Sequence, residues 1–282
     1  MNRTRKVLFQ YGYQARRSLG QHFLVDEGIL RRIAELADLS EGDEVLEIGS
    51  GPGNLTKYLL ERAGRVMAME IEPELVKILK SQLQSEKLEV LEEDILRFDL
   101  KKLKGEKKLK VVANLPYNIS TEVIFRLLEA SGIFSELYLM LQKEVAERVV
   151  AKPGTKDYGI LAVISQFHSE PEILLRLGPG AFHPRPRVDS ALVKFKVFDL
   201  PRYELANYLD FKKLVRAMFG KRRKTLRNAL SKSGLGLDKS QAEELLKKAG
   251  ISPQARAEQI ELERLVLFSN LYTQMKKDAG AG

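Results

Sequence analysis

The stretch from Glu44 to Thr56 restricts the possible folds of this chain more than any other part of it. It reads Glu-Val-Leu-Glu-Ile-Gly-Ser-Gly-Pro-Gly-Asn-Leu-Thr, so a short apolar run typical of a buried strand leads into three glycines, and Leu55, Leu59 and Leu60 then begin a helical pattern. Glycines at a strand-to-helix turn let the backbone approach a bound molecule, and the first amide groups of the helix point toward it. The stretch therefore predicts a ligand-binding turn, with an ordinary tight turn as the alternative.

The spacing of the glycines distinguishes two classes of cofactor. A dinucleotide-binding turn has the pattern Gly-x-Gly-x-x-Gly, but the sixth position here is Asn54, and the third glycine, Gly53, comes one residue early. Glu47, Gly49, Gly51 and Gly53 instead resemble the first motif of methyltransferases that depend on S-adenosylmethionine. This resemblance implies S-adenosylmethionine as the cofactor.

The length and composition of the chain exclude several classes of protein. At 282 residues it is long enough for one large domain and one smaller domain. No apolar run reaches membrane-spanning length and the first five residues lack the apolar core of a signal peptide, so we expect a soluble cytoplasmic protein without a membrane partner. The absence of cysteine excludes disulfides and thiolate metal sites, and three scattered histidines predict no bound metal.

The net charge of +9 is concentrated in two regions. Residues 201–250 carry thirteen basic residues against five acidic ones. Residues 1–25 carry no acidic residue and five basic ones, which are Arg3, Arg5, Lys6, Arg16 and Arg17. Because the basic residues are concentrated in this way, we expect them to bind a polyanion. The alternative is that they form a lysine-rich surface that contacts only water.

Two acidic residues follow predicted strands at the edge where a ligand is expected. Arg65–Glu70 reads as the second strand and Leu88–Leu91 as the third, which places Glu70 and Asp94 near their carboxyl ends. Ligands of open α/β sheets bind beyond these ends, and an acidic residue after the second strand can accept hydrogen bonds from a ribose diol. We therefore expect Glu70 to bind a ribose and Asp94 to accept a hydrogen bond from an adenine amine, with a turn or capping residue as the alternative for Asp94.

The fourth predicted strand, Lys110–Asn114, ends in the motif Asn-Leu-Pro-Tyr. An exocyclic adenine amine is a poor nucleophile because its lone pair is delocalised into the ring. Two acceptors, the Asn114 amide oxygen and the main-chain carbonyl of Leu115, would favour the tetrahedral nitrogen needed for attack. Pro116 stiffens the turn, and Tyr117 offers a ring on which a base can stack. The motif predicts methyl transfer to an amine without a general base, and an ordinary turn is the alternative.

Four motifs together resemble those of the ribosomal small-subunit RNA adenine dimethyltransferases, over a span from about Leu19 to the last predicted helices. They are Gln21-His-Phe-Leu24, Glu47–Gly53, Asn114–Tyr117 and Phe182-His-Pro-Arg-Pro-Arg-Val-Asp-Ser190. The resemblance implies an α/β, Rossmann-like methyltransferase fold with a small all-helical C-terminal domain. It also implies a set of residues that contact S-adenosylmethionine: His22, Leu24, Gly49, Gly51, Glu70, Asp94 and Asn114. His22 stands where the family often has asparagine.

Phe182 has two interpretations. Pro184 and Pro186 hold an extended segment behind it, so its ring can close one face of an adenine opposite Tyr117 after that base leaves helical RNA. Alternatively, Phe182 is an apolar anchor for a loop between two strands.

The remaining periodicity predicts three domains. Strands are expected at Leu137–Gln142, Glu172–Leu177 and Ala191–Phe198, the last two as an antiparallel pair, with a helix at Tyr158–Phe167. Beyond Pro201 the apolar residues recur only at helical spacing. We therefore expect a basic arm at residues 1–25, a catalytic domain at 26–200 and a helical RNA-binding domain at 201–282.

One helix of the last domain is expected to contact RNA phosphates. The cluster Lys221-Arg-Arg-Lys224 and the nearby Arg227 supply its positive charge. The residues expected on RNA are Arg222, Arg223, Lys224 and Arg227.

The resemblance implies an enzyme that methylates N6 of two adjacent adenines in small-subunit (16S) ribosomal RNA, twice per base. We expect a monomer that acts on the 30S particle. One alternative is the related large-subunit RNA dimethyltransferase that confers macrolide resistance, although the length and the long basic helical tail argue against it. The other is a ribosome-assembly factor in which methylation is secondary.

Overall fold

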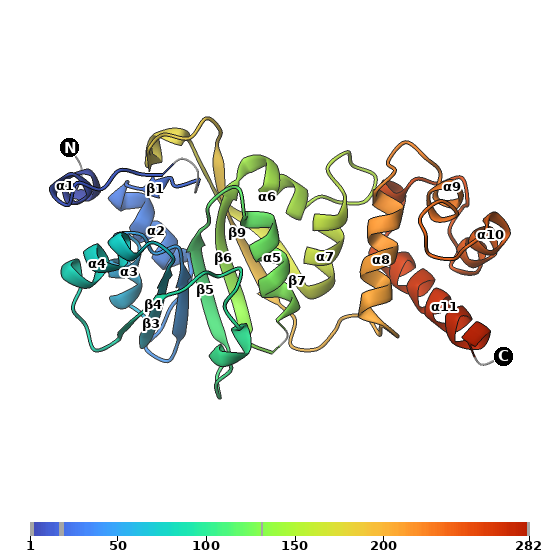
Figure 1. Ribbon diagram of the computed structural model, residues 1–282, viewed down its shortest axis with the longest axis horizontal. Helices are drawn as coiled ribbons and strands as arrows, with labels where there is room; N and C mark the ends of the chain where they lie inside the picture. Colours follow the sequence, from blue (N-terminus) through green and yellow to red (C-terminus); the bar gives the residue numbers. More distant parts are fainter. Residues whose placement is uncertain (1–2, 17–19, 131, 281–282) are drawn as a thin grey trace. The chain divides into compact units, whose positions relative to one another are not determined.

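The computed structural model describes residues 3–16, 20–130 and 132–280, so Arg17 and Leu19 lie outside the described residues, as do the side chains of Arg3 and Arg5 (Figure 1). The chain divides into two compact units, residues 1–146 with 169–199 and residues 147–168 with 200–282. The segment 147–168, which we expected in the catalytic domain, thus belongs to the second unit. The reason is that Phe167 packs its ring against Phe211, with 4.9 Å between the ring centroids.

A seven-stranded sheet with the order β4-β3-β2-β5-β6-β9-β7 forms the centre of the first unit. Its strands are β2 (Glu44–Ile48), β3 (Arg65–Glu70), β4 (Leu88–Glu92), β5 (Leu109–Asn114), β6 (Phe134–Gln142), β7 (Ser169–Leu177) and β9 (Ser190–Val197). The pairs from β4 to β6 are parallel, whereas β9 runs antiparallel to both β6 and β7. The expected antiparallel pair is confirmed, and the mostly parallel sheet with its helices is the Rossmann-like α/β fold.

The direction in which strands are added reverses between β2 and β5. From β2 the chain proceeds outward through β3 and β4, and it then returns to place β5 and β6 on the other side of β2. Ile48 at the end of β2 lies beside Ala113 of β5. Gly49 and Asn114, the next residues of each strand, therefore meet at the crevice where such sheets bind ligands.

Three helices connect parallel strands of this sheet: α3 (Thr56–Leu60), α4 (Pro73–Gln82) and α5 (Ser120–Glu129). Helix α2 (Glu27–Leu36) precedes β2, and α6 (Lys143–Val149) follows β6. Asp26 caps α2 by accepting a hydrogen bond from the Ile29 amide at 3.0 Å. Ile33 of α2 and Leu59 of α3 pack with Val112 of β5 in one buried cluster. The helices are thus held on the sheet by their apolar stripe.

The expected basic arm is folded into the first unit. It contains two elements that we did not predict, α1 (Arg3–Gln10) and β1 (Phe23–Leu24), and β1 pairs with β8 (Phe182–His183). Leu8 of α1 is buried in a cluster with Ile78 of α4. The arm is therefore not a separate element, because apolar residues between its basic ones reach a core of their own.

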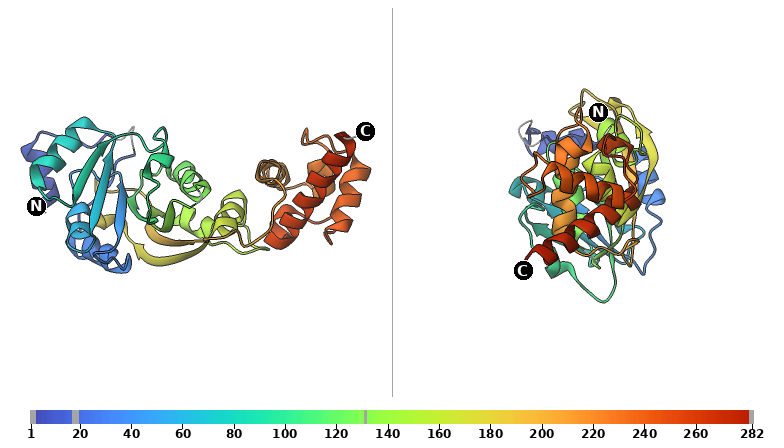
Figure 2. Two further views of the ribbon diagram at one scale, coloured as in Figure 1. Left: turned by 90° about the horizontal axis from the view of Figure 1, so that it is seen from below. Right: turned by 90° about the vertical axis from the view of Figure 1, so that its right-hand side faces the viewer.

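The second unit is entirely helical in its described part. It contains α7 (Ile160–His168), α8 (Tyr208–Phe219), α9 (Leu226–Leu230), α10 (Lys239–Lys248) and α11 (Leu262–Gly280), of which the last three lie close together in Figure 2. Side chains cap two of these helices: Asn207 accepts from the Asp210 amide at 3.0 Å, and Asp238 accepts from the Gln241 amide at 2.8 Å.

The basic cluster does not lie on one helix, so that part of our expectation is wrong. Helix α8 ends at Phe219, and Lys221–Lys224 form a turn before α9 begins at Leu226. Only Arg227 lies on α9. The helix ends here because local hydrogen bonds replace the helical pattern. The Gly220 amide donates to the Arg216 carbonyl, and the Lys224 amide donates to the Lys221 carbonyl, which closes a turn.

Candidate active site

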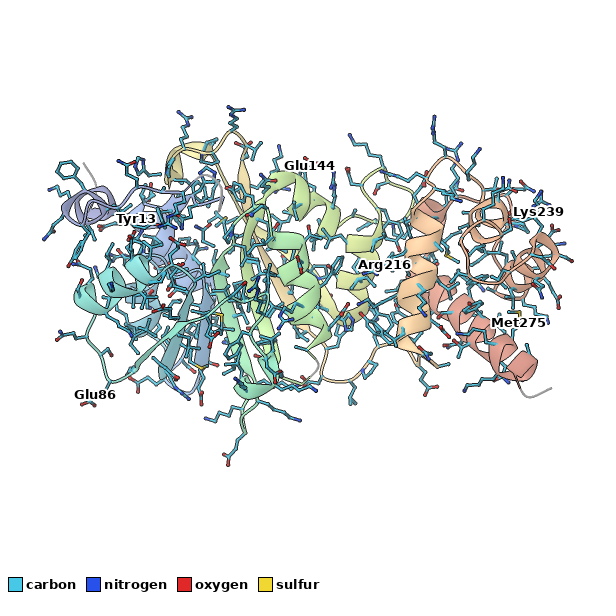
Figure 3. The ribbon with its side chains drawn as sticks, in the orientation of Figure 1. Tyr13, Glu86, Glu144, Arg216, Lys239 and Met275 are labelled. Atoms are coloured by element: carbon cyan, nitrogen blue, oxygen red, sulfur yellow. The ribbon has the colours of Figure 1, made fainter. Side chains whose placement is uncertain are left out.

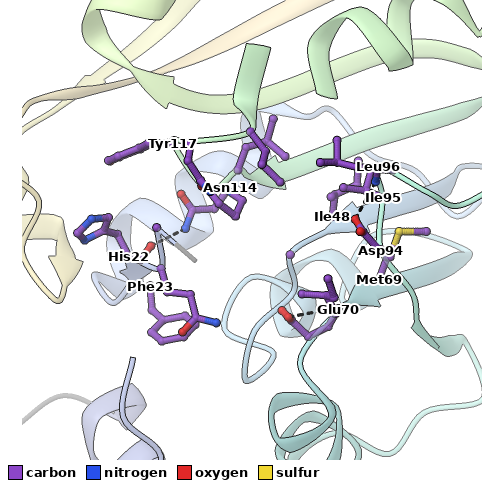
Figure 4. Close-up of a pocket in the computed structure, with 18 of the residues that line it drawn as sticks. His22, Phe23, Ile48, Met69, Glu70, Asp94, Ile95, Leu96, Asn114 and Tyr117 are labelled. Carbon is purple, nitrogen blue, oxygen red and sulfur yellow. Dashed lines mark hydrogen bonds between the residues drawn. The ribbon is translucent and has the colours of Figure 1, made fainter. Parts of the chain in front are cut away.

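A cavity of about 240 Å³ lies at the carboxyl ends of β2, β3 and β5 (Figure 4). The short segment before and within β1 closes it from the other side. Seven of the residues that we expected in the site line this cavity: His22, Gly49, Glu70, Asp94, Asn114, Leu115 and Tyr117. The sheet thus brings together side chains from four separate parts of the sequence.

Glu70 ends β3 and is only 6% exposed. One carboxylate oxygen accepts a hydrogen bond from the Gly51 amide at 2.8 Å, and the other accepts from the amides of Ile71 and Glu72 at 2.9 and 3.0 Å. Burial raises the pKa of Glu70. Because a carboxylate can accept about four hydrogen bonds and three are already made, Glu70 can hold the glycine turn and still accept a hydrogen bond from a ribose hydroxyl in the cavity.

The variant Glu70→Gln should weaken the binding of S-adenosylmethionine by about 1–3 kcal/mol, because an amide offers one acceptor oxygen where the carboxylate offers two. Calorimetric titration measures the loss. Glu92→Gln makes the same change at the end of the neighbouring strand, on an exposed residue that does not line the cavity, and should bind normally. Equal affinity of the Glu70 variant and the control would remove Glu70 from the site.

Glu47 is a second buried carboxyl group close to the glycine turn. It is 2% exposed, and its Oε2 atom has no hydrogen-bond partner within the described chain. Burial, together with the charge of Glu70, raises the pKa of Glu47 to about 8. Glu47 therefore carries a proton at neutral pH, and the turn holds no more than one buried negative charge from this pair.

The glycine turn needs glycine for its backbone conformation. Gly49, Gly51 and Gly53 have φ angles of 70°, 55° and 88°, which other residues adopt only with strain. A Cβ on Gly51 would also lie 3.0 Å from the ring of Phe23, so glycine lets β1 pack closely over the turn.

Gly51 and Leu24, both expected to contact the cofactor, do not line the cavity. Gly51 contributes to the site indirectly, because its amide donates a hydrogen bond to the cavity residue Glu70. Leu24 is 3% exposed and pairs with Phe182 in the small sheet. Its contribution here is to hold β1, which carries the cavity residue Phe23.

Asp94 is a turn residue that also lines the cavity. It follows β4, and its Oδ1 atom accepts a hydrogen bond from the Leu96 amide at 2.9 Å, which makes it a turn residue. Its carboxylate nevertheless lines the cavity, next to the buried Ile95. The remaining acceptor positions of the carboxylate suit an adenine amine.

The side-chain amide of Asn114 is hydrogen-bonded through its nitrogen, while its oxygen has no partner in the described chain. Its Nδ2 atom donates a hydrogen bond to the main-chain carbonyl of His22 at 2.8 Å, as drawn in Figure 4. Within the described chain, neither the Asn114 Oδ1 atom nor the neighbouring carbonyl of Leu115 accepts a hydrogen bond. Because the donor half is engaged, the available half of Asn114 is the acceptor that amine chemistry requires.

Tyr117 is fixed at its hydroxyl and on one face. Its hydroxyl group bonds to Ser190 Oγ at 2.7 Å, and its ring stacks on that of His22 with 5.3 Å between centroids. Burial raises the pKa of Tyr117, so the hydroxyl stays neutral. His22 is itself held through Nδ1 by the carbonyl of Pro184 at 2.7 Å. The aromatic wall of the site is therefore rigid before any ligand arrives.

Phe182 does not lie in the cavity, which corrects the catalytic role that we considered for it. Its side chain is 1% exposed and belongs to the core cluster that also contains Leu24 and Ala181. Two residues of this motif reach the site instead, Pro184 through His22 and Ser190 through the Tyr117 hydroxyl. The structure thus favours the apolar anchor, because the pairing of β1 with β8 turns the ring inward.

Two residues of the cavity escaped the sequence analysis although a signal existed. Ile71 follows Glu70 directly and is 49% exposed, so it offers an apolar surface at the mouth of the site. Gln21 accepts hydrogen bonds from the Tyr13 hydroxyl at 2.9 Å and the Arg16 amide at 2.8 Å. The signal for Ile71 was its position directly after the acidic residue that ends a predicted strand. The signal for Gln21 was its place in the motif Gln21-His-Phe-Leu24.

The lining fits S-adenosylmethionine. Glu70 can accept from a ribose hydroxyl, and Asp94 can accept from the adenine amine. Ile71 and Ile95 supply apolar surfaces for the adenine ring. The positive φ of Gly49 and the absence of a Cβ there leave the backbone open to the methionine part beside Asn114.

The described residues contain neither a metal-binding cluster nor a membrane-spanning helix. No group of three or more histidine, aspartate or glutamate side chains in residues 3–16, 20–130 and 132–280 is arranged to hold a metal ion. No helix of the same residues is long and apolar enough to cross a membrane.

Comparison with known proteins relates most of the chain to one family. The family model "Ribosomal RNA adenine dimethylase" matches residues 12–274. A protein of Geobacter metallireducens named ribosomal RNA small subunit methyltransferase A is 44% identical over 92% of this chain and 95% of its own length, and one of the same name from Alkaliphilus oremlandii is 42% identical over 95% of both.

Two solved structures share the fold of both units. A dimethyladenosine transferase of Plasmodium falciparum superposes with a TM-score of 0.77 at 26% identity, covering 92% of this chain and 98% of that one. The 23S rRNA methyltransferase ErmE superposes with a TM-score of 0.67 at 27% identity, covering 89% and 100%. The cavity at the sheet edge, the two unused acceptors beside Tyr117 and the match over residues 12–274 lead to one conclusion: the chain belongs to the ribosomal RNA adenine dimethylase family.

Proposed function

We propose that this protein transfers methyl groups from S-adenosylmethionine to N6 of two adjacent adenines in small-subunit ribosomal RNA, giving N6,N6-dimethyladenines during ribosome maturation. The observation that carries the proposal is Asn114, whose amide nitrogen is engaged by His22 and whose oxygen lies next to the unused carbonyl of Leu115. Support for the substrate comes from relatives of nearly the same length that are named for the small subunit. We further propose a monomer that meets its substrate in the cytoplasm.

The site residues act on the amine by accepting hydrogen bonds. S-adenosylmethionine, when bound, supplies an electrophilic methyl group on a sulfonium. The target base stacks on Tyr117, and its two N6–H groups donate to the Asn114 amide oxygen and the Leu115 carbonyl. This localises the lone pair on N6, which forms the N–C bond while the electrons of the breaking C–S bond stay with sulfur, and the surplus proton passes to water. Orientation and electrostatic complementarity account for the rate, since the mechanism needs no general base.

Neither alternative function is favoured by the comparisons. The structure of the large-subunit enzyme ErmE superposes less closely than that of the dimethyladenosine transferase, with TM-scores of 0.67 and 0.77. A factor that only assists ribosome assembly would not require the donor half of Asn114 to be engaged and the acceptor half to be open.

The proposal is tested with small ribosomal subunits that lack the modification. We expect incubation with labelled S-adenosylmethionine to place four methyl groups on two adjacent adenines, as read by mapping of the labelled bases. Label in large subunits alone would overturn the choice of substrate. An absence of label from a protein that still binds S-adenosylmethionine would favour the assembly factor.

We also propose that the turn Lys221–Lys224 contacts RNA phosphates from the second unit. Arg223 and Lys224 are exposed and make no ion pair within the described chain. Arg222 donates to the Lys156 carbonyl and remains exposed. Arg227, the fourth expected contact, is paired with Glu243 at 2.9 Å and must leave that carboxylate to reach a phosphate. The first three are thus the stronger candidates.

Replacing Arg223 and Lys224 with Gln should flatten the dependence of log affinity on log salt by about 1.4–1.8, because each lost phosphate contact removes about 0.7–0.9 from the slope. A binding titration with unmodified small subunits at several salt concentrations measures it. The control variant replaces Lys239 and Lys277, two exposed lysines of the same unit without an ion pair in the described chain, and should keep the normal slope. A normal slope in both variants would mean that the turn does not touch RNA.

A further inference from the structure

A groove of about 540 Å³ lies within the second unit, and its lining does not include Lys221–Lys224. Helix α8 provides one wall with Lys213, Arg216 and Ala217, and α11 provides another with Tyr272 and Lys276. Figure 3 labels Arg216 on α8. The third side is the loop Ser233–Leu235, between α9 and α10. Three cations from two helices therefore converge on one concave surface.

The charges of this groove are only partly balanced. Asp210 is its one carboxylate among the described residues and is 4% exposed, and it accepts two hydrogen bonds from Lys276 Nζ, at 2.9 and 3.1 Å. Hydrogen bonding to Asp210 raises the pKa of Lys276, so that lysine stays charged. Lys213 and Arg216 are exposed and have no carboxylate within 4 Å in the described part of the chain. The groove is thus left with two cations that lack a counter-charge.

The loop side of the groove is held in place and contains two backbone amides without a hydrogen-bond partner in the described chain. The Tyr272 hydroxyl donates to the Leu235 carbonyl at 2.9 Å, and the Ser233 hydroxyl donates to the Leu230 carbonyl at 2.5 Å. Gly234 has a φ of 77°, which restricts the position to glycine. In the described chain no hydrogen bond is made by the amides of Gly234 and Leu235. Backbone N–H groups beside unpaired cations are the usual surroundings of a bound phosphate.

We propose that this groove binds a phosphate group of the RNA backbone, as a contact separate from the turn Lys221–Lys224. The planar guanidinium of Arg216 can donate two parallel hydrogen bonds to one phosphate, and Lys213, one turn earlier on α8, supplies a second charge. Lys276 stays on Asp210 and positions the wall of the groove. The proposal rests on the proposed function, since RNA is the polyanion that function supplies. A free phosphate ion is the other source of the same chemistry.

The test compares two variants at Ala217, which lines the groove without carrying charge. Ala217→Glu places a carboxylate among the cations, whereas Ala217→Gln adds a neutral side chain of the same size and similar helix propensity. We expect the Glu variant to bind unmodified small subunits more weakly than the Gln variant, with a gap that closes as salt is raised. Equal affinities at low salt would overturn the proposal.

A second pair of substitutions measures the number of contacts. Lys213→Gln combined with Arg216→Gln should lower the salt slope by about 1.4–1.8, whereas the Lys239 and Lys277 control should not. Circular dichroism and calorimetric binding of S-adenosylmethionine confirm that each variant is folded. A normal salt slope in a folded double variant would overturn the proposal. So would a result in which the substitutions abolish binding of inorganic phosphate but leave the salt slope of RNA binding unchanged.

These readouts are independent of the proposed reaction. If the wild type fails to methylate small subunits, the proposed function fails, whatever the salt slope. If methylation occurs but the groove variants bind normally, only the groove assignment fails.

Discussion

Asn114→Ala should lower the rate of methyl transfer by about 100- to 1,000-fold, as removal of a single preorganised hydrogen-bonding group does in other enzymes. The Asn114 amide oxygen accepts from N6 most strongly when the nitrogen becomes tetrahedral, so the loss falls on the chemical step. Affinity for S-adenosylmethionine should change much less. Single-turnover kinetics with labelled cofactor give the rate, and calorimetry gives the affinity.

Asn114→Asp is the sharper variant because of the hydrogen bond to His22. The second carboxylate oxygen would face the His22 carbonyl, which Nδ2 of Asn114 now approaches at 2.8 Å, so two acceptors would repel each other. Protonation of the new carboxyl group would restore a donor. We therefore expect the rate of this variant, divided by that of the wild type at the same pH, to rise as the pH is lowered. A near-normal rate for Asn114→Ala would contradict the catalytic assignment.

Phe182→Ala should destabilise the first unit by about 3–5 kcal/mol, which is the usual cost of removing a buried phenylalanine side chain. The ring is 1% exposed and lies in the core cluster with Leu24 and Ala181. Denaturant unfolding followed by circular dichroism measures the loss. Because β8 carries Phe182 and pairs with β1, cofactor binding should weaken as well.

Phe182→Leu distinguishes the anchor from a stacking residue. Leucine refills most of the apolar volume, so a core anchor predicts a smaller loss of stability, about 1 kcal/mol, and methylation close to normal. A base-stacking role predicts the opposite, a stable variant with little activity, because leucine offers no aromatic face. The second pattern would restore the catalytic role that the structure argues against.

Short-range spacing was sufficient to predict the strands that hold the site. Arg65–Glu70 was predicted with the bounds that the structure has, and Lys110–Asn114 lacks only Leu109. The turn at Gly49–Gly53 and the two strand-ending residues, Glu70 and Asn114, follow from short apolar runs and from the glycine pattern. Such features depend on residues that are neighbours in the chain, so the sequence alone contains them.

Side-chain direction and long-range pairing could not be predicted in this way. The sequence placed a stacking ring and an apolar anchor on equal terms at Phe182, and only the pairing of residues 23–24 with 182–183 decided between them. Likewise, the charges of Lys221–Lys224 were visible, but whether α8 continued through them was not.

The sequence by itself determined the family, the cofactor and the positions of strands and motifs along the chain, because these follow from local apolar patterns and from motifs at fixed spacing. Tertiary structure alone decided which half of the Asn114 amide remains available, which of Arg223 and Arg227 has a partner, and that Lys213, Arg216 and Lys276 share a groove. The physical reason is that a hydrogen bond or an ion pair depends on distances of about 3–4 Å between atoms that folding brings together from distant parts of the chain.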